Sequence, residues 1–250
     1  MIACTCPKRD HAHKSHKAST VFHWSYDNGK ISKDGIVSFN LPAFKSADGF
    51  AVCPQASTCA LVCYARQGHY VIPRVSTPRE HNLAMVRAAL DDNTLIDTLV
   101  ADIESLHMAW TRIRIHDSGD FFEERYLRAW AEVARRTPWM QYYAYSKMIA
   151  LLNVLRPELP PNLHIVQSAG GKQDALMDLG YAHAVIFSSE QAMMEAGYAN
   201  GTHSDKPAYS GVVKVGLVYH GSTKLSAHKR ELLDKVSDQV QVQELVATLA

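Results

Sequence analysis

Three cysteines lie close together in the stretch AVCPQASTCALVCYAR of this 250-residue chain, as Cys53, Cys59 and Cys63. Thiolates are the ligands that zinc ions and iron–sulfur clusters share, and the clustering favours a metal centre in a reducing compartment over a disulfide framework. Spacing alone leaves both metals open. A zinc site would need a fourth ligand, for which the candidates are Cys4, Cys6 and His69.

A second stretch whose residues could take part in chemistry is RIRIHDSGDFF, which we interpret as a strand followed by a turn of small residues. Gly119 allows a ligand to approach the backbone closely, and the Asp120 carboxylate can accept hydrogen bonds from an ammonium group. Asp117 and Ser118 belong to the same turn. The alternative is that Asp120 caps the helix that follows.

Other predicted strands also end in polar residues. Lys147 and His220 are candidates for substrate binding or proton transfer, with surface exposure as the competing explanation. Gln167 and Ser168 are candidates for cofactor binding, and the amides of the Gly-Gly pair at 170–171 could face a carboxylate or phosphate.

The elements that must position these residues alternate between short apolar strands and helical patterns. This alternation predicts an α/β fold, a partial (β/α)6 TIM-like barrel of parallel strands, with an open doubly wound sheet as the alternative. In either fold, chemistry gathers at the carboxyl ends of the strands. We expect an arm and lead-in over 1–35 and one barrel domain over 36–250, with the cysteines in a loop at 51–70. The predicted strands are 36–40, 112–116, 141–146, 163–168, 184–188 and 212–219.

Helices are predicted between these strands. A capping pattern places one helix start at Thr77, and apolar spacing predicts helices around Leu95 to Leu106 and Tyr126 to Val133. The segment Asn200 to Pro207 is loop-like and a candidate lid. Further helices are expected near 149–156, 172–179, 190–197 and 225–235.

Composition indicates a soluble globular protein with 47% hydrophobic residues and a formal net charge of +1, which gives no global field for gripping nucleic acid. The basic, histidine-rich arm at 8–17 is interpreted as a solvated tail in preference to a phosphate contact. No apolar run is long enough to cross a bilayer, and the first residues lack the apolar core of a secretory signal. We therefore expect a cytoplasmic protein with no membrane partner.

The run Cys63-Tyr64-Ala65 resembles the radical S-adenosylmethionine enzymes, in which an aromatic residue commonly flanks the last of three cysteines. The resemblance implies a [4Fe-4S] cluster on Cys53, Cys59 and Cys63, S-adenosyl-L-methionine as cosubstrate and an electron donor such as flavodoxin. It also makes the turn Ser118-Gly119-Asp120 a candidate receiver for the amino group of the cosubstrate. The spacing departs from the usual C-x3-C-x2-C of that family.

The run Asp117-Ser118-Gly119 is also similar to the strand end of queuine-type guanine transglycosylases. That resemblance implies a structural zinc, Asp117 in contact with a base, and Asp120 or Asp174 as the nucleophile. The zinc cysteines of that family lie late in the chain, whereas these lie early.

Over most of its length the sequence resembles a phage family named after a mycobacteriophage gene product, through the Cys-Pro…Cys…Cys-Tyr-Ala loop and the Arg-Ile-His…Ser-Gly-Asp-Phe strand end. This implies a phage protein in the host cytoplasm and a nucleotide or DNA substrate, for example in thymidine hypermodification. Three hypotheses stay open at this point. They are a noncanonical radical S-adenosylmethionine isomerase or transferase, a zinc-containing base transglycosylase, and a zinc-stabilised nucleic-acid-binding module.

Overall fold

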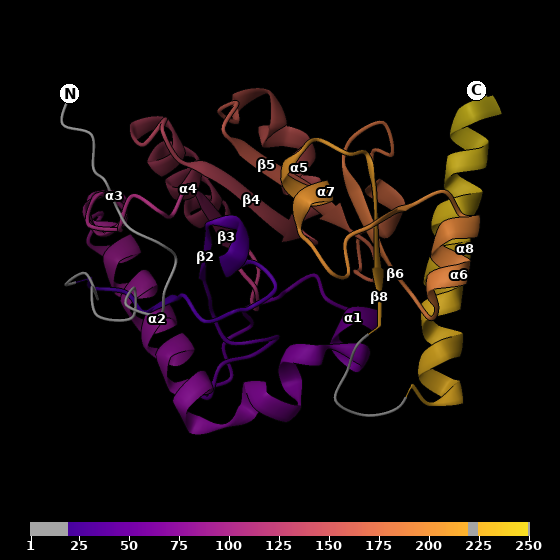
Figure 1. Ribbon diagram of the computed structural model, residues 1–250, viewed down its shortest axis with the longest axis horizontal. Coiled ribbons are helices and arrows are strands. Elements are labelled where there is room, and N and C mark those ends of the chain that lie inside the picture. The colour runs from indigo at the N-terminus through magenta and orange to yellow at the C-terminus, as the bar shows by residue number, and fades with distance from the viewer. Residues whose placement is uncertain (1–19, 220–224, 250) are drawn as a thin grey trace.

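One eight-stranded sheet forms the centre of the computed structural model, which describes residues 20–219 and 225–249 (Figure 1). The strand order is β1-β2-β3-β4-β5-β6-β8-β7, in which only β1 runs antiparallel to its neighbour. The strands are β1 Trp24–Ser25, β2 Ile36–Phe39, β3 Arg112–Ile115, β4 Gln141–Ser146, β5 Leu163–Ser168, β6 His183–Phe187, β7 Ala199–Asn200 and β8 Lys214–Val218.

Helices connect the parallel strands. The α-helices are α1 Thr58–Val62, α2 Pro73–Asp91, α3 Leu95–Glu104, α4 Glu124–Arg136, α5 Ile149–Leu155, α6 Glu190–Glu195, α7 Lys206–Tyr209 and α8 Ala227–Leu249. The 3-10 helices are η2 Ser32–Asp34, η3 Tyr64–Arg66, η4 Gly68–Val71, η5 Arg156–Glu158 and η6 Asp174–Leu176. Of the helices described, none is both long and apolar enough for a membrane span.

The predicted α/β fold with parallel strands is confirmed, and all six predicted strands are present. The strands β2 to β6 and then β8 follow one another in chain order, whereas a doubly wound sheet reverses its order at a switch point. The doubly wound alternative is therefore wrong. Closure of the sheet into a partial barrel stays a prediction.

Successive side chains along a strand point to opposite faces of the sheet, so each face has its own part of the core. Tyr142 and Ala144 of β4 pack in the cluster that contains residues of α2, α3 and α4. Tyr143, between them in sequence, packs with Ile31 and Ala208 on the opposite face. The crossover helices thus cover one face, and the lead-in and the segment around α7 cover the other.

Three helix predictions are wrong in detail. The last helix, expected near 225–235, runs from Ala227 to Leu249. Helix α2 begins at Pro73 and not after Thr77, because Pro73 occupies a first-turn position where its missing N–H costs nothing, and Pro78 lies inside the helix. Only the 3-10 turn η6 forms within 172–179. There the Asp174 carboxylate accepts hydrogen bonds from the amides of residues 170 and 171, which holds the chain in a turn.

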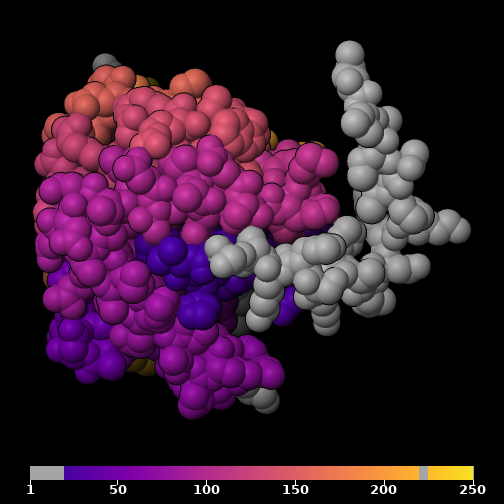
Figure 2. Space-filling view, turned by 90° about the vertical axis from the view of Figure 1, so that its left-hand side faces the viewer, coloured from indigo at the N-terminus to yellow at the C-terminus, as the bar shows by residue number. Residues whose placement is uncertain are grey.

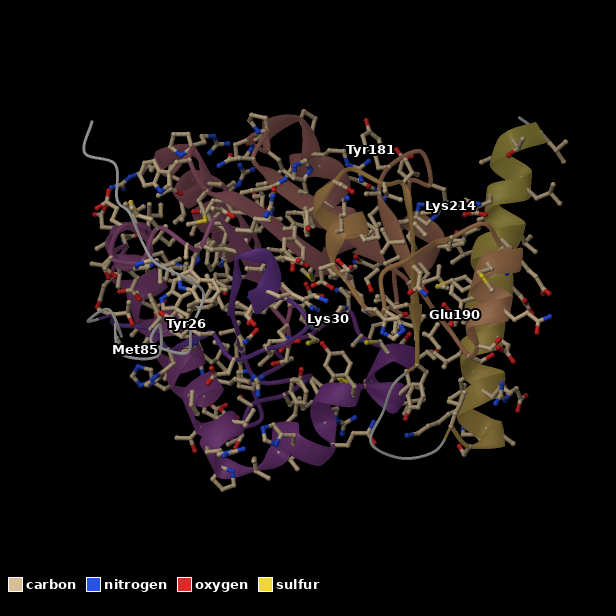
Figure 3. All side chains as sticks on the ribbon, viewed as in Figure 1. Tyr26, Lys30, Met85, Tyr181, Glu190 and Lys214 are labelled. Atoms are coloured by element: carbon tan, nitrogen blue, oxygen red, sulfur yellow. The ribbon has the colours of Figure 1, made fainter. Side chains whose placement is uncertain are left out.

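The candidate lid at 200–207 is anchored to the rest of the fold by Asp205, which is 1% exposed. Its carboxylate lies 2.7 Å from Lys30 Nζ and 2.8 Å from Arg114, and it accepts a 2.8 Å hydrogen bond from Tyr143. Burial alone would raise the pKa of Asp205, but Arg114 and Lys30 hold it below its ordinary value. Lys30 lies near the middle of the molecule in Figure 3.

Substitution Asp205→Asn should lower the free energy of unfolding by about 3 kcal/mol, because the largely buried Arg114 and the half-buried Lys30 would lose their closest counter-charge. Denaturant unfolding measures the loss. The matched control is Asp97→Asn, which removes an exposed pair with Arg136 and should cost no more than about 1 kcal/mol. Equal losses in the two variants would contradict the anchoring role.

Candidate active site

The three cysteines lie in the connection between β2 and α2. Cys59 is part of α1, and Cys63 follows the last residue of that helix. All three are free thiols of intermediate exposure. The loop is docked on the turn after β5, since the amides of Ser57 and Cys59 both donate to the carbonyl of Gly170, at 3.2 and 3.0 Å.

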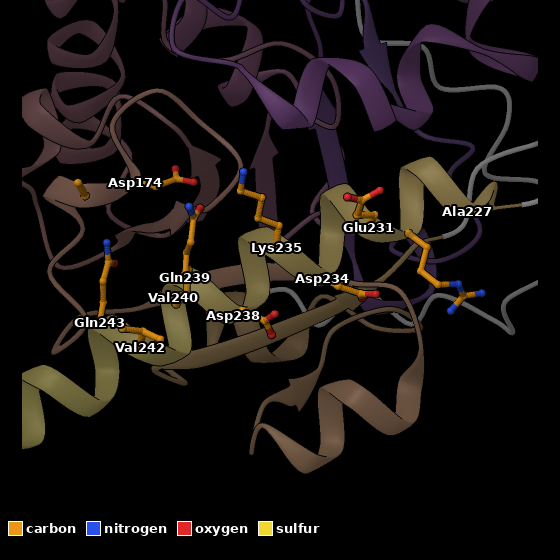
Figure 4. A pocket seen from close by; sticks show the side chains of 12 residues that line it. Asp174, Ala227, Glu231, Asp234, Lys235, Asp238, Gln239, Val240, Val242 and Gln243 are labelled. Carbon is orange, nitrogen blue, oxygen red and sulfur yellow. The ribbon is translucent and has the colours of Figure 1, made fainter.

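Gly170 is required at this docking point. It has φ +91°, and a Cβ there would lie 3.3 Å from the amide nitrogen of Cys59. The amides of the Gly-Gly pair donate to the chain's own Asp174, and binding of a ligand's carboxylate or phosphate there stays a prediction. Asp174 also borders a groove of about 880 Å³ along α8 (Figure 4).

Burial controls the protonation of the thiols. It raises the pKa of Cys63 to about 11, with a further contribution from Cys59, and together with the Asp120 carboxylate it raises the pKa of Cys53. Among the described residues, no three His, Cys, Asp or Glu side chains form a group that could hold a metal ion as they stand. The donor set nevertheless fits an iron–sulfur cluster in kind, because one compact loop supplies three reduced thiols.

Lys147 is the cation beside these thiols. It is 8% exposed, follows the end of β4 and donates a 2.8 Å hydrogen bond to Ser168 Oγ. Burial lowers the pKa of Lys147, but Cys59, Asp120 and Cys53 outweigh that effect and bring the pKa above its ordinary value. The structure therefore brings together Lys147, Ser168 and the cysteine loop.

Asp120 is buried behind Lys147 and has three internal donors. Its carboxylate accepts hydrogen bonds from Ser146 Oγ at 2.6 Å, from the Lys147 amide at 2.9 Å and from the Phe121 amide at 2.7 Å. These bonds tie the end of β3 to the end of β4. Reception of a cosubstrate amino group by Asp120 stays a prediction.

Ser118 and Gly119 fasten the same turn to the end of β2. Ser118 donates to the carbonyl of Leu41 at 2.6 Å and accepts from the Leu41 amide at 3.0 Å. Gly119 has φ +98°, and a Cβ there would lie 2.7 Å from Leu41 Cβ. The backbone at Gly119 is thus closely approached by another group, and that group is Leu41.

Asp117 lies on the other side of Tyr64 from the thiols. Its side chain is 8% exposed and accepts hydrogen bonds from Tyr64 at 3.0 Å and from Tyr70 at 3.0 and 3.2 Å. Arg79 and Arg114 lie 3.8 and 3.9 Å from the carboxylate. Burial, and then the Asp117 charge, raise the pKa of Tyr64 well above its ordinary value, so this phenol stays protonated as a donor.

A cleft of about 870 Å³ reaches Asp117 from the surface. It is bounded by the lead-in from Thr20 to Gly29, the end of β2, η4 and the first turns of α2. Figure 2 shows this side of the molecule, where the indigo lead-in is bordered by the purple and magenta atoms of the following helices. His69, the candidate fourth zinc ligand, is exposed and lines this cleft.

One predicted residue is not at the site. Gln167 is fully buried and exchanges hydrogen bonds with the backbone of Asp178, at 2.7 and 2.9 Å, so it braces a turn. His220 lies outside the described residues, as do Cys4 and Cys6. Sequence reasoning missed Tyr70, Arg79 and also Asn40, whose side chain accepts from the Asp117 amide at 2.7 Å. Asn40 ends the first predicted strand, and that position was the available signal.

Comparison with known proteins places the sequence among phage proteins without adding a structural template. Residues 8–234 match a family model described as Gene product 88. The Gene 88 proteins of Mycobacterium phages L5 and D29 are each 36% identical over 138 residues, which cover 53% of this chain and 56% of each relative. The alignment thus spans little more than half of those relatives. No solved structure matches significantly.

Substitution Gly119→Ala should lower the free energy of unfolding by about 3 kcal/mol, since it adds both a positive-φ penalty and a clash with Leu41. Gly49→Ala is the control. Gly49 has φ +86°, but nothing lies within 4 Å of the position that a Cβ would take there, so this change should cost about 1 kcal/mol. Chemical denaturation compares the two. If Gly119→Ala lowers the free energy of unfolding no more than Gly49→Ala does, Leu41 moves aside and the clash is absent.

Proposed function

The chain belongs to the gene product 88 family, and from its site we propose that it is a radical S-adenosylmethionine-type enzyme acting on a nucleotide or DNA base. The observation that carries the proposal is the placement of the thiols. Three reduced cysteines from one loop meet a buried lysine at the carboxyl ends of parallel strands, where such folds conduct chemistry. The substrate class is inferred from the phage relatives.

Cys53, Cys59 and Cys63 would hold a [4Fe-4S] cluster. When bound, such a cluster supplies the electron that reduces S-adenosylmethionine and so begins radical chemistry on the substrate. The chain's own contribution is to hold and shield this reaction. Lys147 supplies positive charge against the thiolates, and the half-buried loop limits the access of water.

Tyr64 joins the cysteine loop to the cleft in which we place the substrate. It follows Cys63 directly, and its hydroxyl donates to both the backbone carbonyl and the carboxylate of Asp117. Asp117 lines the cleft, so Tyr64 connects the cysteine loop to a residue of the cleft wall. We assign Asp117 to substrate orientation, with an electron donor of the flavodoxin type as an external partner.

The transglycosylase alternative has weaker support. Its candidate nucleophiles are Asp120 and Asp174, and a nucleophile needs an oxygen free to reach the substrate. Asp120 accepts three internal hydrogen bonds, and Asp174 accepts two from backbone amides. Asp120 is thus enclosed by the fold, whereas Asp174 is held by backbone amides and still borders the groove along α8.

Anaerobic purification and reconstitution, followed by iron, sulfide and zinc analysis, test the proposal. We expect about four irons per chain, a visible absorption band that dithionite bleaches, and reductive cleavage of S-adenosylmethionine. Cys59→Ser should remove both the iron and the cleavage. Leu61→Ser, an exposed position in the same helix, is the control and should retain them.

Stoichiometric zinc without iron would reject the radical proposal and leave the zinc-dependent alternatives. Retention of iron and cleavage by the Cys59→Ser variant would reject the ligand assignment. Because Leu61 is 60% exposed, loss in the Leu61→Ser control would indicate damage to α1 and not loss of a ligand.

A further inference from the structure

The cleft above Asp117 contains an arginine with unmet hydrogen-bonding capacity. Arg79 is 9% exposed, and its Nε has no hydrogen-bond partner. The guanidinium group lies 4.6 Å above the ring of Tyr70 and donates from Nη1 to the carbonyl of Val75 at 3.2 Å. A buried donor without an acceptor is costly, so an acceptor that reached Arg79 from the cleft would stabilise it. Because Nε has almost no exposed surface, a shift of the side chain would accompany binding.

The surroundings of Arg79 favour an anionic acceptor. Arg74, one turn earlier in α2, is exposed and lines the same cleft, as do His23 and His69. The N-terminus of α2 begins at Pro73 beside them, which adds the positive end of a helix dipole from a helix of 19 residues. Two acids line the same cleft. They are Asp27 of the lead-in and Asp117, whose carboxylate already has two arginines and two tyrosines beside it.

The dimensions of the cleft suit a nucleotide. Its volume of about 870 Å³ lies within the range of small-molecule sites, roughly 300–1,000 Å³. Its walls carry aromatic side chains, among them Tyr70 and Tyr26, the latter labelled in Figure 3. A group held at the start of α2 leaves the depth of the cleft, toward Asp117, for a sugar and base.

We propose that this cleft binds the phosphate of a nucleotide, with Arg74 and Arg79 as the donors and the first turn of α2 beside them. The inference rests on the proposed nucleotide substrate and deepens it by placing the phosphate. The phosphate can belong to a free nucleotide or to a DNA strand, since the donors contact the same phosphate oxygens in either case.

Calorimetric titration of the purified chain separates these sources. The ligands are inorganic phosphate, thymidine, thymidine monophosphate and a short single-stranded oligothymidylate. We expect the monophosphate or the oligonucleotide to bind at least about tenfold tighter than thymidine. Binding of the monophosphate indicates a free nucleotide, and binding of the oligonucleotide alone, weakened by salt, indicates a strand. Either result supports a phosphate site.

Variants then locate the site. Arg74→Gln should weaken the phosphate-bearing ligand about tenfold and leave thymidine unaffected, and it should fold normally because Arg74 is exposed. Arg79→Lys keeps the charge but lacks Nε, and it should also weaken binding. Arg87→Gln, farther along α2 and paired with Asp48, is the control and should change nothing.

Equal binding of thymidine and its monophosphate, or equal effects of Arg74→Gln and Arg87→Gln, would overturn the proposal. The titration is carried out on both metal-free and reconstituted protein. If the protein binds ligands through phosphate but takes up no iron, the phosphate site is supported while the assignment as a radical enzyme is rejected.

Discussion

The buried carboxylate of Asp120 is the interaction on which the geometry of the site depends. A carboxylate that is 4% exposed must be compensated by donors, and it finds them at the ends of two neighbouring strands. One donor is the backbone amide of Lys147. Asp120 therefore fixes the backbone from which the lysine side chain extends toward Ser168 and the thiols. The turn that holds Asp120 is itself locked to β2 through Ser118 and Gly119.

A second set of charges lies on the face of the sheet that the lead-in and the segment around α7 cover. Arg114 lies 2.8 Å from Asp205 and 3.9 Å from Asp117, so one guanidinium group links the anchored segment to the floor of the cleft. Asp117 is also contacted from the cysteine loop by Tyr64 and from α2 by Arg79. Because these partners come from separate parts of the chain, the carboxylate is oriented by the whole fold. Under the proposed function, a substrate would meet an acceptor that the fold has already oriented.

The sequence predicts local features well and long-range contacts poorly. The six parallel strands and the polar residues at their ends follow from apolar runs and turn residues, which are local signals. The contacts of Asp205 with Lys30 and Arg114 join positions far apart in the chain, and no spacing rule reveals them. Gln167 also shows that the sequence does not predict contacts between distant residues. Its position at a strand end was correct, but the pleat directs the side chain to Asp178.

Lys147 illustrates how burial decides between chemical roles. A strand-end lysine fits proton transfer or substrate binding when only its position is known. Beside Cys53, Cys59 and Asp120 its pKa is raised, so at neutral pH it keeps its proton and is poorly suited to act as a base. The same positive charge lowers the pKa of the Cys53 and Cys63 thiols, although burial raises them by more. Since metals bind thiolates, a fixed cation here lowers the cost of deprotonating the loop. We infer that Lys147 balances charge at the thiols.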